Sequence, residues 1–328
     1  MDVAEIVSPV PLCTPAGRLN PAAVGWSRRP LHTANLRGWG RTKRWEYWGI
    51  VTPTAIVGLT VSSLDYLGLL SIYVCDRRSG TELMRTSLDP LARGVELGDR
   101  SGVGVARGSS GGLTLTFASS AAGTRLAAAA PGVRLDAHVG PGRESLGVVV
   151  PWSDRLFQYT VKDVDRPVEG SLRLDDEVIT FGGDDGAFAV LDHGRGRWPY
   201  SMTWNWAAGS GQVAGRRIGL QLGGKWTDGT GSTENALFVD GRMHKIGEDL
   251  SWTYDRGDWM APWRIRGARV DVAFAPFHER DERTNALVVA SEIHQCFGVF
   301  TGWVADDSGQ RIPVDGVVGW AEEARNRW

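Results

Sequence analysis

The 328-residue sequence has few cysteines, no long apolar run and almost no excess of either charge. Its three cysteines, Cys13, Cys75 and Cys296, are far apart and odd in number, which argues against a disulfide framework and a cysteine-ligated zinc site. The net charge of -2 gives no reason to expect nucleic acid or an anionic membrane surface as a partner. The most apolar region, residues 49–70, is interrupted by Pro53, so no transmembrane segment is expected.

No export signal is expected either, because the first residues carry acids where a signal peptide needs positive charge. We therefore predict a soluble, cytoplasmic protein. One segment departs from the balanced charge, since residues 26–45 contain no acid and hold six cations. These are Arg28, Arg29, Arg37, Arg41, Lys43 and Arg44. The segment predicts either a site for a phosphate or carboxylate, or a basic surface offset by acids elsewhere.

Motifs for common cofactors and nucleophiles are absent or incomplete. Residues 108–112 have the spacing of a nucleophile elbow around Ser110, but a strand is expected after them where that motif needs a helix. We interpret them as a glycine-rich hairpin. No dinucleotide fingerprint or phosphate-binding loop is present, so no cofactor is expected. His278, Glu279 and His294 are metal-ligand types, but adjacent strand positions point to opposite faces, so no metal is expected.

Alternation of apolar and polar residues dominates the chain and predicts half-buried strands. Such strands are expected at residues 113–117, 133–138, 171–175 and 269–274. Glycines supply turns, and hairpins are expected around residues 239–242 and 306–309. The best helical candidates are residues 118–130 and the tail 319–328. The pattern predicts an all-β, mainly antiparallel protein whose strands close into barrels or stack as sandwiches.

The chain is too long for one small barrel, and the polar stretch 162–169 separates two strand-rich halves. We expect two consecutive β-domains, residues 1–165 and 166–328. Trp45, Tyr47 and Trp48 belong to the first and are expected to pack against the second. Ten of the fifteen tryptophans follow residue 166, which places the expected ligand pocket in the second half.

Residues 190–211 are the most informative segment, because they combine aromatic, charged and amide side chains between glycines. Aromatic faces with polar edges suit a pocket for an apolar small molecule, such as an isoprenoid, a lipid or a polyketide-like compound. The residues expected to bind it are Arg195, Trp198, Trp204, Asn205, Trp206, Asn235, Trp263 and His278. The expected catalytic residues are Asp192, Tyr200 and His294.

Three functions are consistent with this pocket. In the first, burial raises the pKa of Asp192, with Arg195 tuning it, so that it protonates an alkene near neutral pH. Aromatic faces then stabilise the carbocation and His294 or an amide orients water, as in a cofactor-free hydratase, isomerase or cyclase. Alternatively, Asp192 forms a structural ion pair with Arg195 or Arg197. The protein is then a non-catalytic carrier of an apolar ligand, or a structural or interaction protein.

Several motifs carry a family resemblance across nearly the whole chain. They include Arg44-Trp-Glu-Tyr-Trp-Gly49, Asp192-His-Gly-Arg-Gly-Arg-Trp-Pro-Tyr200, Trp204-Asn-Trp-Ala-Ala-Gly209 and Gly319-Trp-Ala-Glu-Glu323. Through them the sequence resembles the family described as domain of unknown function 2804. That family is similar in pattern to paired lipocalin-like barrels, which include carotenoid 1,2-hydratases and natural-product cyclases. The resemblance implies two lipocalin-like β-domains, and it implies no particular reaction.

Overall fold

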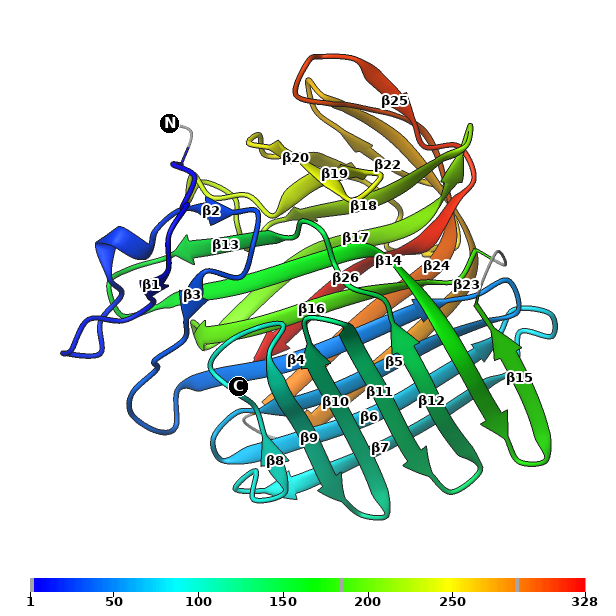
Figure 1. Ribbon diagram of the computed structural model, residues 1–328, viewed down its shortest axis with the longest axis horizontal. Helices are drawn as coiled ribbons and strands as arrows, with labels where there is room; N and C mark the ends of the chain where they lie inside the picture. The colour runs from blue at the N-terminus through cyan, green and yellow to red at the C-terminus, as the bar shows by residue number, and fades with distance from the viewer. Residues whose placement is uncertain (1–2, 183–185, 287–288, 328) are drawn as a thin grey trace.

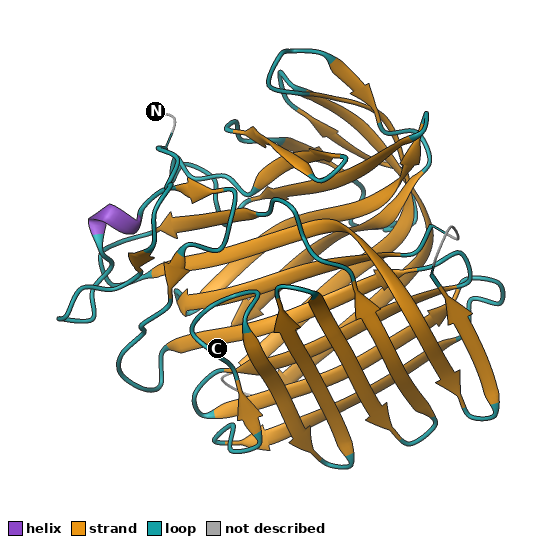
Figure 2. Cartoon of the chain, viewed as in Figure 1, coloured by secondary structure: helices purple, strands orange, loops and turns teal. Residues whose placement is uncertain are grey.

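The computed structural model describes residues 3–182, 186–286 and 289–327, and these residues form almost entirely antiparallel β-sheet (Figure 2). Within them the only helix is a short 3-10 turn, η1 (Pro21–Ala23), and no helix is long and apolar enough to cross a membrane. A two-stranded parallel ribbon joins β1 (Val10–Pro11) to β3 (His32–Thr33). The prediction of an all-β, mainly antiparallel fold is confirmed.

The first sheet contains fourteen strands in the described part of the chain (Figure 1). They are β2 (Trp26–Ser27), β4 (Thr42–Val51), β5 (Ala55–Ser63), β6 (Leu67–Asp76), β7 (Glu82–Pro90), β8 (Val95–Glu96), β9 (Gly104–Ser110), β10 (Leu113–Ser120), β11 (Gly123–Ala130), β12 (Val133–Val139), β13 (Leu146–Pro151), β14 (Phe157–Leu174), β15 (Glu177–Phe181) and β16 (Phe188–Arg197). Its main path runs β7-β6-β5-β4-β16-β14-β12-β11-β10-β9-β8.

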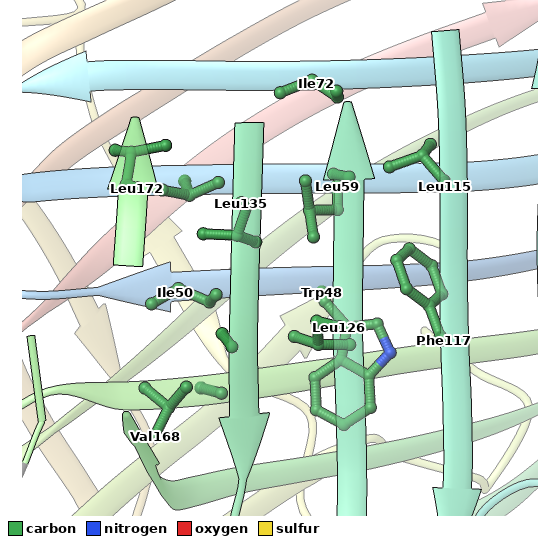
Figure 3. Packing of buried hydrophobic residues seen from close by; sticks show 14 of the residues in the cluster. Trp48, Ile50, Leu59, Ile72, Leu115, Phe117, Leu126, Leu135, Val168 and Leu172 are labelled. Atoms are coloured by element: carbon green, nitrogen blue, oxygen red, sulfur yellow. The ribbon is translucent and has the colours of Figure 1, made fainter. Parts of the chain in front are cut away.

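This sheet folds back on itself into a nearly closed barrel, in which β9 to β12 cross over β4 to β6 (Figure 1). The inward side chains form one apolar core. Leu59 and Ile72 from one wall meet Leu115, Phe117 and Leu135 from the other, and all five are buried (Figure 3). Side chains alternate between the two faces of each strand, so the inward ones fill this barrel. The outward ones are free to contact other parts of the molecule.

The second sheet contains ten strands within the described residues. They are β17 (Ser201–Val213), β18 (Arg216–Gly224), β19 (Asn235–Val239), β20 (Arg242–Ile246), β21 (Ser251–Thr253), β22 (Trp263–Arg266), β23 (Val270–Ala286), β24 (Val289–Ala305), β25 (Arg311–Pro313) and β26 (Val317–Arg327). The order β20-β19-β18-β17-β26-β24-β23-β22-β21 curls into a half-barrel around its own apolar core.

Most local predictions from the sequence are confirmed. Ser110 ends β9, and glycines at 111 and 112 with positive φ connect β9 to β10, as expected of a glycine-rich hairpin. The turn at residues 239–242 joins β19 to β20, with Asp240 and Gly241 both at positive φ. The two helical candidates are wrong. Residues 118–130 form part of the β10–β11 hairpin, because Leu126 and Ala128 face the barrel core, and the described tail is β26.

The outer face of the first sheet packs against the second sheet through β14, β16 and β4. Tyr47 lies edge-on to Trp206 and Trp320, with ring centroids 5.6 and 6.0 Å apart. Trp45 packs against Trp198, near the start of the second sheet. Trp48 instead points into the first barrel core, because neighbouring strand positions face opposite sides. Two of the three aromatics expected at this interface therefore reach it.

The boundary expected at residue 166 falls inside β14, and the chain passes from the first sheet to the second between Arg197 and Ser201. The charged stretch is not a solvated linker, because four of its five charged side chains are buried and form ion pairs at a β-bulge. Lys162 pairs with Asp192 and Arg166 with Asp163, while Asp165 pairs with Arg217. A polar stretch can mark a buried interface between layers as well as a surface loop.

Candidate functional site

Three buried carboxylates and one buried lysine lie where the two sheets meet. We call this group, Asp192, Glu234, Glu322 and Lys162, the interfacial carboxylate cluster. Lys162 Nζ on β14 lies 3.1 Å from Asp192 Oδ1 on β16 and 3.3 Å from Glu234 Oε2, just before β19. The ammonium also lies over the Trp206 ring, 4.3 Å from its centroid. One cation is thus shared by two carboxylates from different sheets.

Each carboxylate of the cluster accepts a hydrogen bond from an indole N–H. The three pairs are Trp45 to Asp192 at 3.1 Å, Trp226 to Glu234 at 2.6 Å and Trp204 to Glu322 at 3.0 Å. Thr160 also donates to Asp192 at 3.1 Å, and Gln295 donates to Glu322 at 2.9 Å. The tryptophans of this protein therefore satisfy buried acids in addition to providing apolar area.

The cluster contains three carboxylates and only one cation, Lys162, and this imbalance shifts the pKa values of its members. Burial raises the pKa of Glu322 to about 7, because Trp204 and the more distant Lys162 offset the desolvation only in part. Burial also raises the pKa of Glu234. Burial alone would lower the pKa of Lys162, but Asp192 and Glu234 outweigh it and raise that pKa. The cluster can therefore hold a transferable proton near neutral pH, with Glu322 as its holder.

Tyr47 adds a neutral hydroxyl beside Glu322. Gln295, which donates to Glu322, and Glu322 itself both act on the Tyr47 phenol, and burial raises the pKa of that phenol above its ordinary value. Arg280 lies 3.4 Å from the Gln295 carbonyl oxygen and over the ring of Tyr73. Because Tyr47 stays protonated, it offers a hydrogen-bond donor next to the acid.

A wall of tryptophans covers one side of the cluster. Trp198 is its centre, stacked on Trp226 at 5.4 Å and packed edge-on against Trp45, Trp152 and Trp204 at 5.2 to 5.8 Å. Trp198 and Trp226 are buried, while Trp45, Trp152 and Trp204 are half-buried. Trp45 and Trp204 are thus partly exposed to solvent, and their indole N–H groups donate to the buried Asp192 and Glu322.

The structure brings only some of the sequence-predicted site residues together. Asp192, Trp198, Trp204 and Trp206 belong to the cluster or its wall, as described above. Arg195 does not, because it lies on the opposite face of β16 and its guanidinium donates to the carbonyls of Gly98, Trp45 and Gly194. The alternative in which Asp192 pairs with Arg195 or Arg197 has a different cation in the structure, because Lys162 pairs with Asp192.

The other predicted residues lie elsewhere. Tyr200 is 50% exposed on the surface. Asn235 bridges the Gly223 amide and the Glu248 carbonyl, which gives it a structural role. Asn205 donates to Tyr254 at 3.1 Å, and Trp263 stacks on that same Tyr254 at 4.1 Å. Both lie on the inner face of the second sheet, which alternation separates from Glu322.

His294 lies on that inner face as well. Its imidazole stacks on Trp259 at 4.1 Å, and its Nδ1 lies 2.8 Å from a Glu279 oxygen. Possible ligand atoms of Glu279, Asp281 and His294 lie within 4.8 Å of one another, so these three could in principle hold a metal ion. His278 points elsewhere, to Glu82 across the sheets at 2.5 Å. His294 and Asp192 thus belong to separate environments.

The residues that sequence reasoning missed are Lys162, Glu234, Glu322, Tyr47 and Gln295. A signal existed for all five, because each falls within a motif that carries the family resemblance. These motifs are residues 44–49, 157–162, 234–241, 294–298 and 319–323. Within the motifs, nothing marked these five side chains as members of one site. Lys162 and Glu234 pair across the sheets, which no local pattern reveals.

The basic segment at residues 26–45 is partly neutralised by acids from other segments. Arg28 pairs with Glu5 at 3.3 Å and with Glu144 at 3.2 Å, and Arg44 lies 3.4 Å from Asp65. Lys43 is buried, which lowers its pKa to about 7. These contacts support the expectation of a basic stretch offset by acids elsewhere.

The two-sheet architecture is similar to that of several solved structures. A structure of CghA with Sch210972 has 13% identity and a TM-score of 0.56, and the match covers 88% of each chain. A protein described as AttH from Nitrosomonas europaea has 12% identity and a TM-score of 0.56, covering 86% of this chain and 92% of that one. Kievitone hydratase from Nectria haematococca has 9% identity and a TM-score of 0.50, covering 88% and 89%.

These likenesses place the chain among lipocalin-like, two-sheet β-proteins and concern the fold alone. A comparison with curated protein sequences finds no match. The model of the family described as domain of unknown function (DUF2804) matches residues 3–328. The chain belongs to this family, as the sequence motifs indicated.

Proposed function

We propose that the interfacial carboxylate cluster is the polar floor of a site for a hydrophobic small molecule, and that Glu322 donates a proton to that molecule in a cofactor-free reaction. The observation that carries this proposal is the position of Glu322. It is buried between two sheets, its pKa is raised to about 7, and it is hydrogen-bonded to two neutral donors, Trp204 and Gln295. An acid with a pKa near the working pH is well suited to proton transfer.

Asp192 has a different role in this proposal. Its three partners, Trp45, Thr160 and Lys162, all donate to it, so it acts as an anchor that holds Lys162 in place. The sequence-based prediction of Asp192 as the acid stays open as an alternative. The two carboxyls belong to different sheets, and separate variants distinguish them.

The reaction class follows from the groups around Glu322. Its carboxyl proton adds to one carbon of an alkene and leaves a carbocation at the other, which the accessible indole face of Trp204 stabilises. Water held by the Tyr47 hydroxyl attacks the cation, and its surplus proton returns to Glu322. The net result is hydration, and loss of a different proton gives isomerisation. The name of the structurally similar kievitone hydratase makes hydration the first reaction to test.

The experiment compares molecules that co-purify with the wild type and with Glu322→Gln, using native mass spectrometry and chromatography of the extracted ligand. If the protein is a catalyst, both proteins should carry an apolar molecule. The molecule from the variant should then differ from that of the wild type by one water, or be its isomer. Glu96→Gln, on the outside of the first sheet, is the matched control and should resemble the wild type. Identical molecules in all three proteins would favour a carrier.

Binding itself is tested with the apolar fluorophore 1-anilinonaphthalene-8-sulfonate. Stoichiometric binding that is displaced by the extracted molecule supports the site. A protein that neither co-purifies with an apolar molecule nor binds the fluorophore at the tryptophan wall would overturn the proposal and favour a structural or interaction protein.

A further inference from the structure

A second concave region lies away from the carboxylate cluster. It is a cleft of about 470 Å³ between the N-terminal residues 3–5, β2 and β13 on one side and the loop at residues 231–233 on the other. Figure 1 shows the N-terminal segment above β2 and β13, on the side where β20 approaches. Its apolar wall is formed by the half-buried Trp26 and the buried Val148. Both residues also pack into the tryptophan wall of the first site, which separates the two regions.

The rim of this cleft carries three cations, Arg28, Lys245 and Arg269, against two carboxylates, Glu5 and Asp307. Glu5 pairs with Arg28 at 3.3 Å, and Asp307 lies 3.4 Å from Arg269. Arg28 also pairs at 3.2 Å with Glu144, which is not among the lining residues. The lining itself carries one more cation than carboxylates, and in a partly enclosed space this favours an anionic group.

The loop at residues 229–233, Gly-Thr-Gly-Ser-Thr, supplies hydroxyl groups to the same cleft. Gly229 and Gly231 have φ of +73° and +77°, which lets the chain turn tightly there. Ser232 lines the cleft, is only 2% exposed, and its hydroxyl has no hydrogen-bond partner among the described residues. Lys245 Nζ donates to Thr233 of this loop, to the Ile246 carbonyl at 2.8 Å and, at a long 3.4 Å, to the Asn235 carbonyl, which holds the ammonium beside the loop. A buried hydroxyl next to a positioned cation is a typical arrangement for an oxyanion.

We propose that this cleft binds a phosphate monoester with an apolar body. The apolar body lies against Trp26 and Val148, and the phosphate oxygens accept hydrogen bonds from Ser232 and charge-assisted bonds from Lys245 and Arg269. The bond from Lys245 replaces its long 3.4 Å contact with the Asn235 carbonyl. Arg28, whose guanidinium lies 5.3 Å from the Trp26 ring centroid, closes the cleft from the side of β2. This site does not depend on the reaction proposed for Glu322.

Phenyl phosphate is the probe, because it combines a phosphate dianion with a small apolar ring. Isothermal titration calorimetry should show binding to one site that weakens as salt is raised. Inorganic phosphate should bind less tightly and phenol should not bind measurably, while benzoate tests whether a carboxylate suffices. Lys245→Met should weaken phenyl phosphate binding by about tenfold or more, as expected for loss of a charge-assisted hydrogen bond.

Two further variants keep the result interpretable. Ser232→Ala removes only a hydroxyl and should weaken binding several-fold even if Lys245→Met proves unstable. Arg107→Gln removes an exposed cation on the first sheet and should change nothing. No saturable binding of phenyl phosphate, or equal binding by the wild type, Lys245→Met and Ser232→Ala, would overturn the proposal. Tighter binding of benzoate than of phenyl phosphate would overturn the choice of a phosphate.

Discussion

At the scale of single residues, the decisive feature is that each buried acid in the space between the sheets has its own indole N–H donor. A buried carboxylate without a partner costs several kcal/mol, so each of the three takes an N–H donor from a tryptophan. Two of them also share Lys162. Glu322 makes no ion pair among the described residues. The more distant Lys162 and Arg280 offset its desolvation only in part, so the energetic cost of ionising it appears as a raised pKa.

This raised pKa predicts an unusual dependence of stability on pH. Between pH 4.5 and about 7 the native state keeps the Glu322 proton and the unfolded state releases it, so stability falls as pH rises through this window. Glu322→Gln removes that loss. We expect the variant to match the wild type in urea unfolding at pH 4.5 and to exceed it at pH 8 by about 3 kcal/mol at most. An equal difference at both pH values would contradict the assignment.

The two neighbouring tryptophans of β17 should respond differently to truncation. Trp206 is buried, donates to Gln221 at 2.9 Å and carries Lys162 on its ring, so Trp206→Ala should cost ~3–5 kcal/mol of stability. Trp204 is half-buried, so Trp204→Ala should leave the melting temperature nearer that of the wild type while weakening fluorophore binding several-fold. Melting curves and fluorescence titrations of both variants check this. A reversed pattern would assign Trp204 to the core and Trp206 to the ligand.

At the scale of elements, strands of one sheet can approach the other because key positions lack a side chain. Gly49 on β4 is such a position. A Cβ there would lie 2.5 Å from the Trp320 ring of β26. Trp320 in turn packs against Trp206 with centroids 5.2 Å apart, so displacing it would disturb the aromatic contact between the sheets.

We therefore expect Gly49→Ala to destabilise the protein by about 1–3 kcal/mol through overpacking. Gly98→Ala is the control, because a Cβ at that position meets nothing within 4 Å. Chemical denaturation of both variants provides the measurement. If Gly49→Ala is as stable as the wild type, the two sheets are not held in close contact at this point.

At the scale of the whole molecule, Lys162 ties the two sheets together. It lies on β14 of the first sheet, and its partner Glu234 leads into β19 of the second. Because the ion pairs lie in the interior, they are shielded from salt and from competing water.

Lys162→Met should lower the stability by ~3–5 kcal/mol, because it leaves Asp192 and Glu234 buried without their cation. Adding Asp192→Asn and Glu234→Gln to the same protein should recover much of the loss, since the repelling charges are then gone. Denaturation followed by tryptophan fluorescence measures both proteins. A triple variant no more stable than Lys162→Met would show that lost packing, and not charge, causes the effect.

Local alternation in the sequence was enough to predict the class of fold and individual hairpins. Residues 113–117 and 133–138 lie within the strands observed there, and the turn at Asp240 and Gly241 was recognisable from residues adjacent in the chain. The prediction failed for the alanine-rich residues 118–130. Alanine favours a helix in isolation, and only the partner strands, which bury Leu126 and Ala128, decide otherwise.

The tertiary structure alone decided which polar residues lie next to one another. Asp192 and Trp204 were recognisable because they stand in an unusual local composition, but Lys162, Glu234 and Glu322 come from three distant segments. His294 and Arg195 seemed to belong with Asp192, and the alternation of strand faces separates them from it. The physical reason is that strand periodicity depends on residues a few positions apart, whereas the burial of a charge depends on what the opposite sheet places against it.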